Sequence, residues 1–224
     1  KLVDEERRQI AEAIRLHTEV TGSRPLGWYT GRCSMNTVRL VMEEGGFLYS
    51  SDSYADDLPY WLKAPGGEKH LVIPYTLDAN DMRFATPQGF NTGEHFYQYL
   101  KDSFDVLYAE GATHPKMLSV GLHCRLAGRP GRAAALARFL DYVKGHGDAW
   151  VATRLDIARN WIETQPPAGG YDPARMPAAL FAERYAEAFG SRIAAEAAKR
   201  AGLTAEQLAK AREFERSSRS AQSG

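Results

Sequence analysis

The 224-residue sequence lacks several features that would assign it to a class at once. It has no excess of either charge, because Lys and Arg together number 28 and so do Asp and Glu. Proteins that bind the phosphate backbone of nucleic acid carry a basic surface, so the balanced charge argues against that class. No segment of the given sequence has the pattern expected of a signal peptide, and no apolar run is long enough to span a bilayer. These absences favour a cytoplasmic globular protein without nucleic-acid or membrane partners.

Cysteine is also scarce. Cys33 and Cys124 are the two cysteines, too few for a disulfide framework, and we expect both to be reduced thiols. The sequence has no His-x-x-x-His or His-Glu-x-x-His pattern, and no glycine-rich phosphate loop after a strand. No cofactor is therefore indicated by the residues present. The chain begins at Lys1 rather than Met, so we expect an N-terminal part to be missing, and a divalent metal held by that part stays open.

Helical and extended patterns alternate along the first 165 residues. Apolar periodicity and end signals predict helices over 4–20, 34–44, 93–110, 132–143 and 155–162, the second of them capped by Ser34. Short apolar runs predict strands over 27–31, 47–50, 70–76, 117–122 and 149–152, and polar loops cover 51–61 and 77–92. This alternation predicts an α/β fold with a largely parallel sheet or part of a barrel. The strands are too few to close an eight-unit barrel.

The composition changes after residue 165. Residues 166–177 are rich in proline and glycine and are expected to form a linker. Residues 178–224 are expected to be an Ala-rich helical extension with a disordered end. Its helical stripe consists of Phe181, Tyr185, Phe189 and Ile193. We expect this stripe to pack on the main domain, 1–165, or on a neighbouring subunit of a homo-oligomer.

Polar side chains follow several expected strands at the point where each strand ends. Arg32 follows the first strand, Asp52 the second and Asp78 the third, and His123 ends the apolar run over 118–122. The carboxyl ends of parallel strands share one edge of a sheet, so we expect these groups to meet in one cleft. Such a set suits hydrolysis of an amide-like bond, in which a base activates water and an acid protonates the leaving nitrogen. We therefore predict His123, Asp52 and Arg32 as catalytic residues.

Nearby residues are candidates for binding the substrate. Tyr54 and Trp61 can stack on a flat ring, while Asp56 and Asp78 offer hydrogen-bond acceptors. Arg129 lies just before an expected helix, where an anion can be held. No set of metal ligands emerges from these residues.

Each of these residues also has a structural alternative. Arg32 would pair with an acid of the next loop, Asp56 would shape a turn, and the aromatic side chains would belong to the core. Asp78 would belong to a self-bonded polar loop together with Asn80, Asp81 and Arg83. Spacing alone does not decide between the two readings.

Four segments carry a resemblance to a known family. They are RPLGWYTGR (24–32), FLYSSDSYADDLPYW (47–61), PYTLDANDMRFATPQGFNTG (74–93) and MLSVGLHCRLAGRPGR (117–132). In this order and spacing they resemble the polysaccharide deacetylase superfamily, which has the NodB-homology fold. The likeness is strongest to its allantoinase branch and covers residues 1–165, as the C-terminal half of the domain.

The resemblance implies a distorted, incomplete (β/α) barrel of about seven strands with its site at their carboxyl ends. It places Arg32 in the third family motif, Asp52 in the fourth, and His123 in the fifth, where the histidine assists as an acid. The first two motifs, including the metal-binding histidines of true deacetylases, would lie upstream of Lys1. The allantoinase branch is thought to open the hydantoin ring of allantoin to allantoate without a bound metal.

Three functions follow as hypotheses. The first is a hydrolase of carbon–nitrogen bonds other than peptide bonds, an allantoinase of purine catabolism acting on a cyclic ureide. The second keeps the fold and makes the protein a metal-dependent deacetylase of polysaccharide or peptidoglycan. The third is a non-catalytic segment for partner binding or assembly.

Overall fold

The computed structural model describes residues 2–63 and 69–168 and divides into two compact units. Unit 1 contains the described residues up to 52, those within 60–73, and 153–168; unit 2 contains 53–59 and 74–152. The predicted extension over 178–224 and most of the predicted linker lie outside the described residues. Among the described residues, no helix combines the length and apolarity needed to cross a membrane.

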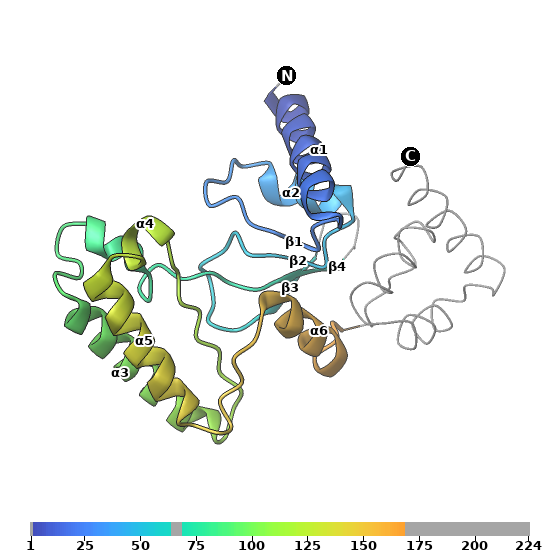
Figure 1. Cartoon of the computed structure of the whole chain (residues 1–224). Coiled ribbons are helices and arrows are strands. Elements are labelled where there is room, and N and C mark those ends of the chain that lie inside the picture. The colour runs from blue at the N-terminus through green and yellow to red at the C-terminus, as the bar shows by residue number, and fades with distance from the viewer. Residues whose placement is uncertain (1, 64–68, 169–224) are drawn as a thin grey trace. The chain divides into compact units, whose positions relative to one another are not determined.

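Unit 1 is built on a four-stranded sheet (Figure 1). Its strands are β1 (Gly27–Trp28), β2 (Tyr49–Ser50), β3 (Tyr60–Lys63) and β4 (Lys69–Val72), in the order β1-β2-β4-β3. β1, β2 and β4 are parallel, as the alternating pattern predicts, and β3 is antiparallel to β4. The sequence missed β3, because its first two residues end a segment that was predicted to be a loop. The α/β class is nevertheless confirmed.

Three helices belong to unit 1: α1 (Leu2–Thr21), α2 (Thr37–Glu44) and α6 (Arg154–Thr164). α1 buries two isoleucines against α2 and the segment before β2. This core cluster consists of Ile10, Ile14, Leu40, Val41 and Phe47. Each fully buried side chain of this kind contributes about 2 kcal/mol.

The ends of α2 and α6 show which local signals the sequence carried. Ser34 is not the cap of α2, since the N-cap residue is Asn36, whose side chain makes no capping bond. Gly45 ends α2 with a φ of 74°, a conformation that favours glycine. Thr153 and Asp156 form a reciprocal capping box at the start of α6.

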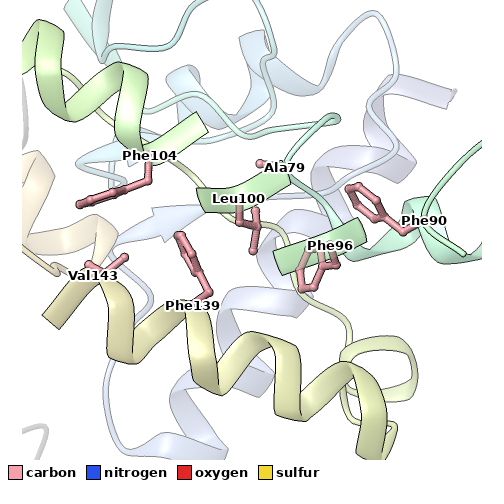
Figure 2. Packing of buried hydrophobic residues seen from close by; sticks show 7 residues of the cluster. All are labelled: Ala79, Phe90, Phe96, Leu100, Phe104, Phe139 and Val143. Carbon is pink, nitrogen blue, oxygen red and sulfur yellow. The ribbon is translucent and has the colours of Figure 1, made fainter. Parts of the chain in front are cut away.

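Unit 2 contains a 3-10 helix, η1 (Asp81–Ala85), and three helices, α3 (Gly93–Gly111), α4 (Cys124–Ala127) and α5 (Pro130–Lys144). α3 and α5 lie side by side with the same direction. A Cβ on Gly93 would lie 2.6 Å from the carbonyl oxygen of Gly131, so glycine permits the close approach at their N-terminal ends. Figure 2 shows the core between them, which consists of Ala79, Phe90, Phe96, Leu100, Phe104, Phe139 and Val143.

Several expectations for unit 2 are wrong. Segments 117–122 and 149–152 are not strands: the first makes a single parallel bridge, Asn80 with Gly121, and the second exposes Trp150 and Val151. Leu140 is an apolar residue of the helix predicted over 132–143, where apolar periodicity indicates a buried face, yet it is exposed. α4 was missed because four residues are too short for a periodic pattern. His123 therefore precedes a short helix instead of ending a strand.

Candidate active site

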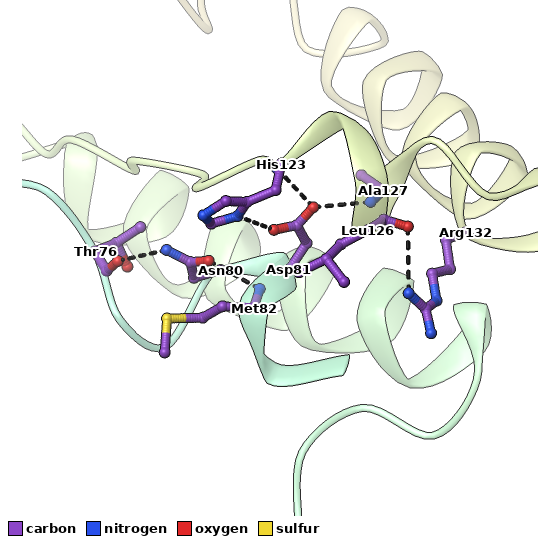
Figure 3. Close-up of polar contacts among 8 residues, drawn as sticks. All are labelled: Thr76, Asn80, Asp81, Met82, His123, Leu126, Ala127 and Arg132. Atoms are coloured by element: carbon purple, nitrogen blue, oxygen red, sulfur yellow. Dashed lines mark hydrogen bonds and ion pairs between the residues drawn. The ribbon is translucent and has the colours of Figure 1, made fainter. Parts of the chain in front are cut away.

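In unit 2, His123 is hydrogen-bonded to the carboxylate of Asp81 through both its side chain and its backbone. The Nδ1 atom of His123 lies 2.6 Å from Oδ1 of Asp81, and the backbone N–H of His123 donates to Oδ2 of the same carboxylate at 2.8 Å. The backbone N–H of Ala127 also donates to Oδ2, at 2.9 Å. Asp81 is fully buried, whereas about a third of the His123 side chain is exposed (32%). Figure 3 shows the carboxylate held between the imidazole and the first turn of α4.

Backbone pairing places these two residues together. Asp81 N–H donates to the carbonyl of Gly121, and Gly121 N–H donates to the carbonyl of Ala79, each at 2.9 Å. A Cβ on Gly121 would lie 2.2 Å from the Asn80 side chain, so this pairing requires glycine there. The side chain of Asn80 is itself fixed by two hydrogen bonds. Its amide N–H₂ donates to the carbonyl of Thr76, and its Oδ1 accepts from the backbone N–H of Met82. The imidazole position is thus determined by two chain segments that are more than forty residues apart.

The pairing also determines how the imidazole is protonated. An ionised carboxylate only accepts hydrogen bonds, so Nδ1 of His123 carries the proton that it donates to Asp81. Nε2 is the remaining ring nitrogen, and no partner for it is found among the described residues. A histidine oriented in this way by a carboxylate can accept or donate a proton at Nε2. This is the arrangement required of an acid or base in hydrolysis.

Asp81 is the functional candidate that the sequence did not single out. The carboxylate bonded to His123 is that of Asp81, which the sequence grouped with a self-bonded loop. Its position, three residues after Asp78 and just beyond an apolar run, was the available signal. The pairing depends on one bridge between Asn80 and Gly121, and local patterns contain no information about such a contact.

Two arginines that follow His123 in the sequence, Arg129 and Arg132, lie in different surroundings. Arg132 donates to the carbonyl of Leu126 at 3.3 Å, and its guanidinium lies 4.1 Å from the centre of the Phe84 ring. Arg129 is the N-cap residue of α5 and is exposed. Its assignment to substrate binding stays a prediction.

A cavity of about 650 Å³ lies within unit 2 and brings together three of the predicted binding residues. Tyr54, Asp56 and Asp78 line it. The Tyr54 ring lies 6.2 Å from that of Tyr75, which also lines the cavity. Asp56 also shapes a turn, as the structural alternative to substrate binding predicts, because its Oδ1 accepts hydrogen bonds from the backbone N–H groups of Asp57 and Leu58.

Asp78 is held as an acceptor in the cavity wall. Oδ1 accepts from the Thr76 hydroxyl at 2.8 Å, and Oδ2 accepts from the Tyr99 hydroxyl at 3.1 Å. Burial raises the pKa of Asp78, but the hydrogen bonds from Thr76, from backbone N–H groups and from Tyr99 outweigh it and leave the pKa below its usual value. The carboxylate is therefore ionised at neutral pH, with lone pairs left for a ligand.

Arg32, Asp52 and Trp61 belong to unit 1, so their convergence with His123 stays a prediction. Asp52 accepts the backbone N–H groups of Thr30 and Gly31 at 2.7–2.9 Å, which fixes the turn after β1. Trp61 Nε1 donates to the carbonyl of Gln165 at 2.7 Å. Arg32 is exposed.

The described residues do not form a metal site by themselves. No group of three or more His, Cys, Asp or Glu side chains among them is placed to hold a metal ion.

Comparison with known proteins identifies the fold. No family profile matches the chain. A protein of Schizosaccharomyces pombe described as a putative polysaccharide deacetylase is 44% identical over 160 residues, covering 65% of this chain and 50% of the relative. A crystal structure of a probable polysaccharide deacetylase from Pseudomonas aeruginosa PAO1 is 65% identical, with a TM-score of 0.71, covering 73% of this chain and 55% of that one.

The crystal structure of PuuE allantoinase gives the same identity, TM-score and coverage as the Pseudomonas structure. A putative polysaccharide deacetylase from Mycobacterium smegmatis is 28% identical, with a TM-score of 0.62, covering 70% of this chain and 56% of that one. The chain thus spans about half the length of the relatives it matches. It is a partial polysaccharide deacetylase-type fold, of the kind that the PuuE allantoinase structure also has.

Proposed function

We propose that this chain contributes the histidine side of a site that hydrolyses a carbon–nitrogen bond outside peptides. The proposed substrate is a cyclic ureide such as allantoin, and the proposed context is purine catabolism. The observation that supports the chemistry most directly is the buried Asp81 carboxylate bonded to Nδ1 of His123. The similarity to PuuE allantoinase at 65% identity supports the choice of substrate.

The proposed reaction adds water across one C–N bond of the hydantoin ring. The carbonyl carbon gains an oxygen and becomes a carboxylate, the ring nitrogen gains a proton, and one proton is released. His123, as an imidazolium held by Asp81, donates the proton from Nε2 to the leaving nitrogen. Alternatively, it donates a hydrogen bond to the oxyanion that forms first. Arg32 and Asp52 keep their predicted roles in holding the substrate or orienting the acid.

The test is release of allantoate from allantoin by the full-length protein, as wild type and as His123→Ala. Loss of a positioned acid lowers kcat by about 10²–10⁴-fold. His114→Ala is a matched control, because His114 is an exposed histidine bonded only to its neighbour Thr113 through the side chain. Unchanged turnover in His123→Ala would contradict the role proposed for this residue.

A second candidate, deacetylation of a polysaccharide, is supported by the descriptions of the S. pombe and P. aeruginosa relatives. It predicts release of acetate from N-acetylated glucosamine oligomers, increased by a divalent metal and abolished by a chelator. Allantoate release that is insensitive to the chelator, without acetate release, would favour the first proposal.

A further inference from the structure

The cavity of unit 2 has a distinct chemical character. Its aromatic contribution comes from three tyrosines, Tyr54, Tyr75 and Tyr99, and an apolar side is formed by Val106, Leu107, Met117 and Leu118. Its size is within the usual range for small-molecule sites, roughly 300–1,000 Å³. Tyrosine rings beside an apolar surface suit a flat, polar ring.

The charged groups at this cavity are of one sign. The carboxylates are those of Asp56, Asp57, Asp78 and Asp102, and no Lys, Arg or His is among the described residues that line it. Asp78 in particular offers only acceptors, because Thr76 and Tyr99 donate to it. A ligand that presents N–H donors can form hydrogen bonds with the carboxylate of Asp78. A ligand that carries a carboxylate presents further acceptors instead, and its negative charge is repelled by the carboxylates of the cavity.

We infer that this cavity selects its ligand by charge: it binds an uncharged ring rich in N–H groups and rejects the ring-opened carboxylate. The inference rests on the proposed function for the identity of the ligand pair. Hydrolysis of one ring C–N bond converts neutral allantoin into the allantoate anion, so the reaction itself creates the charge that the cavity disfavours.

Direct binding of allantoin and allantoate to the full chain, measured by titration calorimetry, tests this inference. Allantoin is expected to bind at least about tenfold more tightly than allantoate, and the difference is expected to shrink as salt screens the carboxylates. Asp78→Asn and Asp102→Asn are expected to reduce the ratio by about threefold or more each, mainly by improving allantoate binding. Asp141→Asn, an exposed acid on α5 outside the cavity, is the control and should leave the ratio unchanged.

Failure of the inference and failure of the proposed function give different results. Equal affinities for the two ligands, no binding of either, or a ratio that is insensitive to Asp78→Asn would overturn the charge selection. Ring opening by a protein that does not discriminate leaves the proposed function intact. Discrimination between the two ligands, together with no ring opening by the full-length protein, supports the inference and counts against the proposed function.

Discussion

The two units place a histidine in opposite surroundings. His70, on β4 of unit 1, is buried, and its Nε2 lies 3.0 Å from the Ser50 hydroxyl. Burial lowers its pKa to about 4, so its imidazole is neutral at physiological pH. His123 of unit 2 is partly exposed and bonded to a buried carboxylate. The first histidine is part of a core, whereas the second can take part in proton transfer.

The carboxylates differ in the same way. In unit 1, Asp52 bonds backbone N–H groups of the turn after β1. It also lies near Cys33, whose thiol pKa is raised to about 11 by burial and by this carboxylate. In unit 2, Asp81 bonds backbone N–H groups too, but its other oxygen orients an imidazole. Both carboxylates anchor backbone, and Asp81 in addition orients the imidazole of His123.

The largest effect is expected from Asp81→Asn. The amide oxygen in the place of Oδ2 can keep the hydrogen bonds from the backbone N–H groups of His123 and Ala127. The N–H₂ group in the place of Oδ1 would instead donate to Nδ1 and reverse the tautomer of His123. We expect kcat for allantoate release to fall by about 10²–10⁴-fold, with a smaller change in KM. Steady-state kinetics on folded protein, with the tautomer followed by ¹⁵N NMR of the imidazole, is the measurement.

Asp52→Asn is the matched variant in unit 1. A fall in kcat comparable with that of Asp81→Asn would support the catalytic role that the sequence predicts for Asp52. A lower melting temperature with unchanged kcat would instead make Asp52 a structural anchor of the turn that contains Thr30 and Gly31.

The long helices were predictable and the pairing at the site was not. α1, α3, α5 and α6 have apolar periodicity and capping signals such as Thr92 and Thr153, and their bounds differ from the predictions by a few residues. The segment over 117–122 has strand-like composition, yet a strand requires partners, and the described residues supply one bridge. The composition of a segment indicates whether it can form a strand, whereas its pairing depends on residues that are far away in the chain.

The site was predictable to a similar extent. His123 was selected from the sequence because it follows an apolar run and its imidazole can take part in proton transfer. Tyr54, Asp56 and Asp78, which the sequence also selected, line one cavity. Asp81 was not separable from Asp78 by sequence, since both are acids of one polar loop. What distinguishes them is burial and the partner of each carboxylate, and both are properties of the packed structure.

The second effect concerns the two cores. Phe96 is fully buried between α3 and α5, so Phe96→Ala is expected to lower the free energy of unfolding by about 3–5 kcal/mol. Leu40→Ala in unit 1 is expected to cost about 2–5 kcal/mol. Amide hydrogen exchange should show faster exchange within the affected unit, because the two clusters share no residue. A uniform increase over both units would show that they unfold together.

The third effect tests the buried histidine. Because the pKa of His70 is lowered to about 4, the unfolded chain binds more protons than the folded chain between pH 6.5 and 4. Stability therefore falls as the pH drops through this range, by about 3 kcal/mol for this group. Urea denaturation of wild type and His70→Asn at several pH values measures it. Equal pH dependence in both proteins would contradict the assignment.

The smallest effect is expected on the outer face of α1. Arg15 pairs with Glu12 at 2.8 Å and with Glu19 at 2.7 Å, but about half of each side chain or more is exposed. Exposed pairs one turn apart are screened by solvent and contribute little, so Arg15→Ala should lower the free energy of unfolding only slightly. Its neighbour Ile14 is buried in the core, and Ile14→Ala should cost several times more, about 2–4 kcal/mol. Similar costs in urea denaturation for the two variants would mean that α1 is stabilised mainly by its charged face, and that its packing in unit 1 is weak.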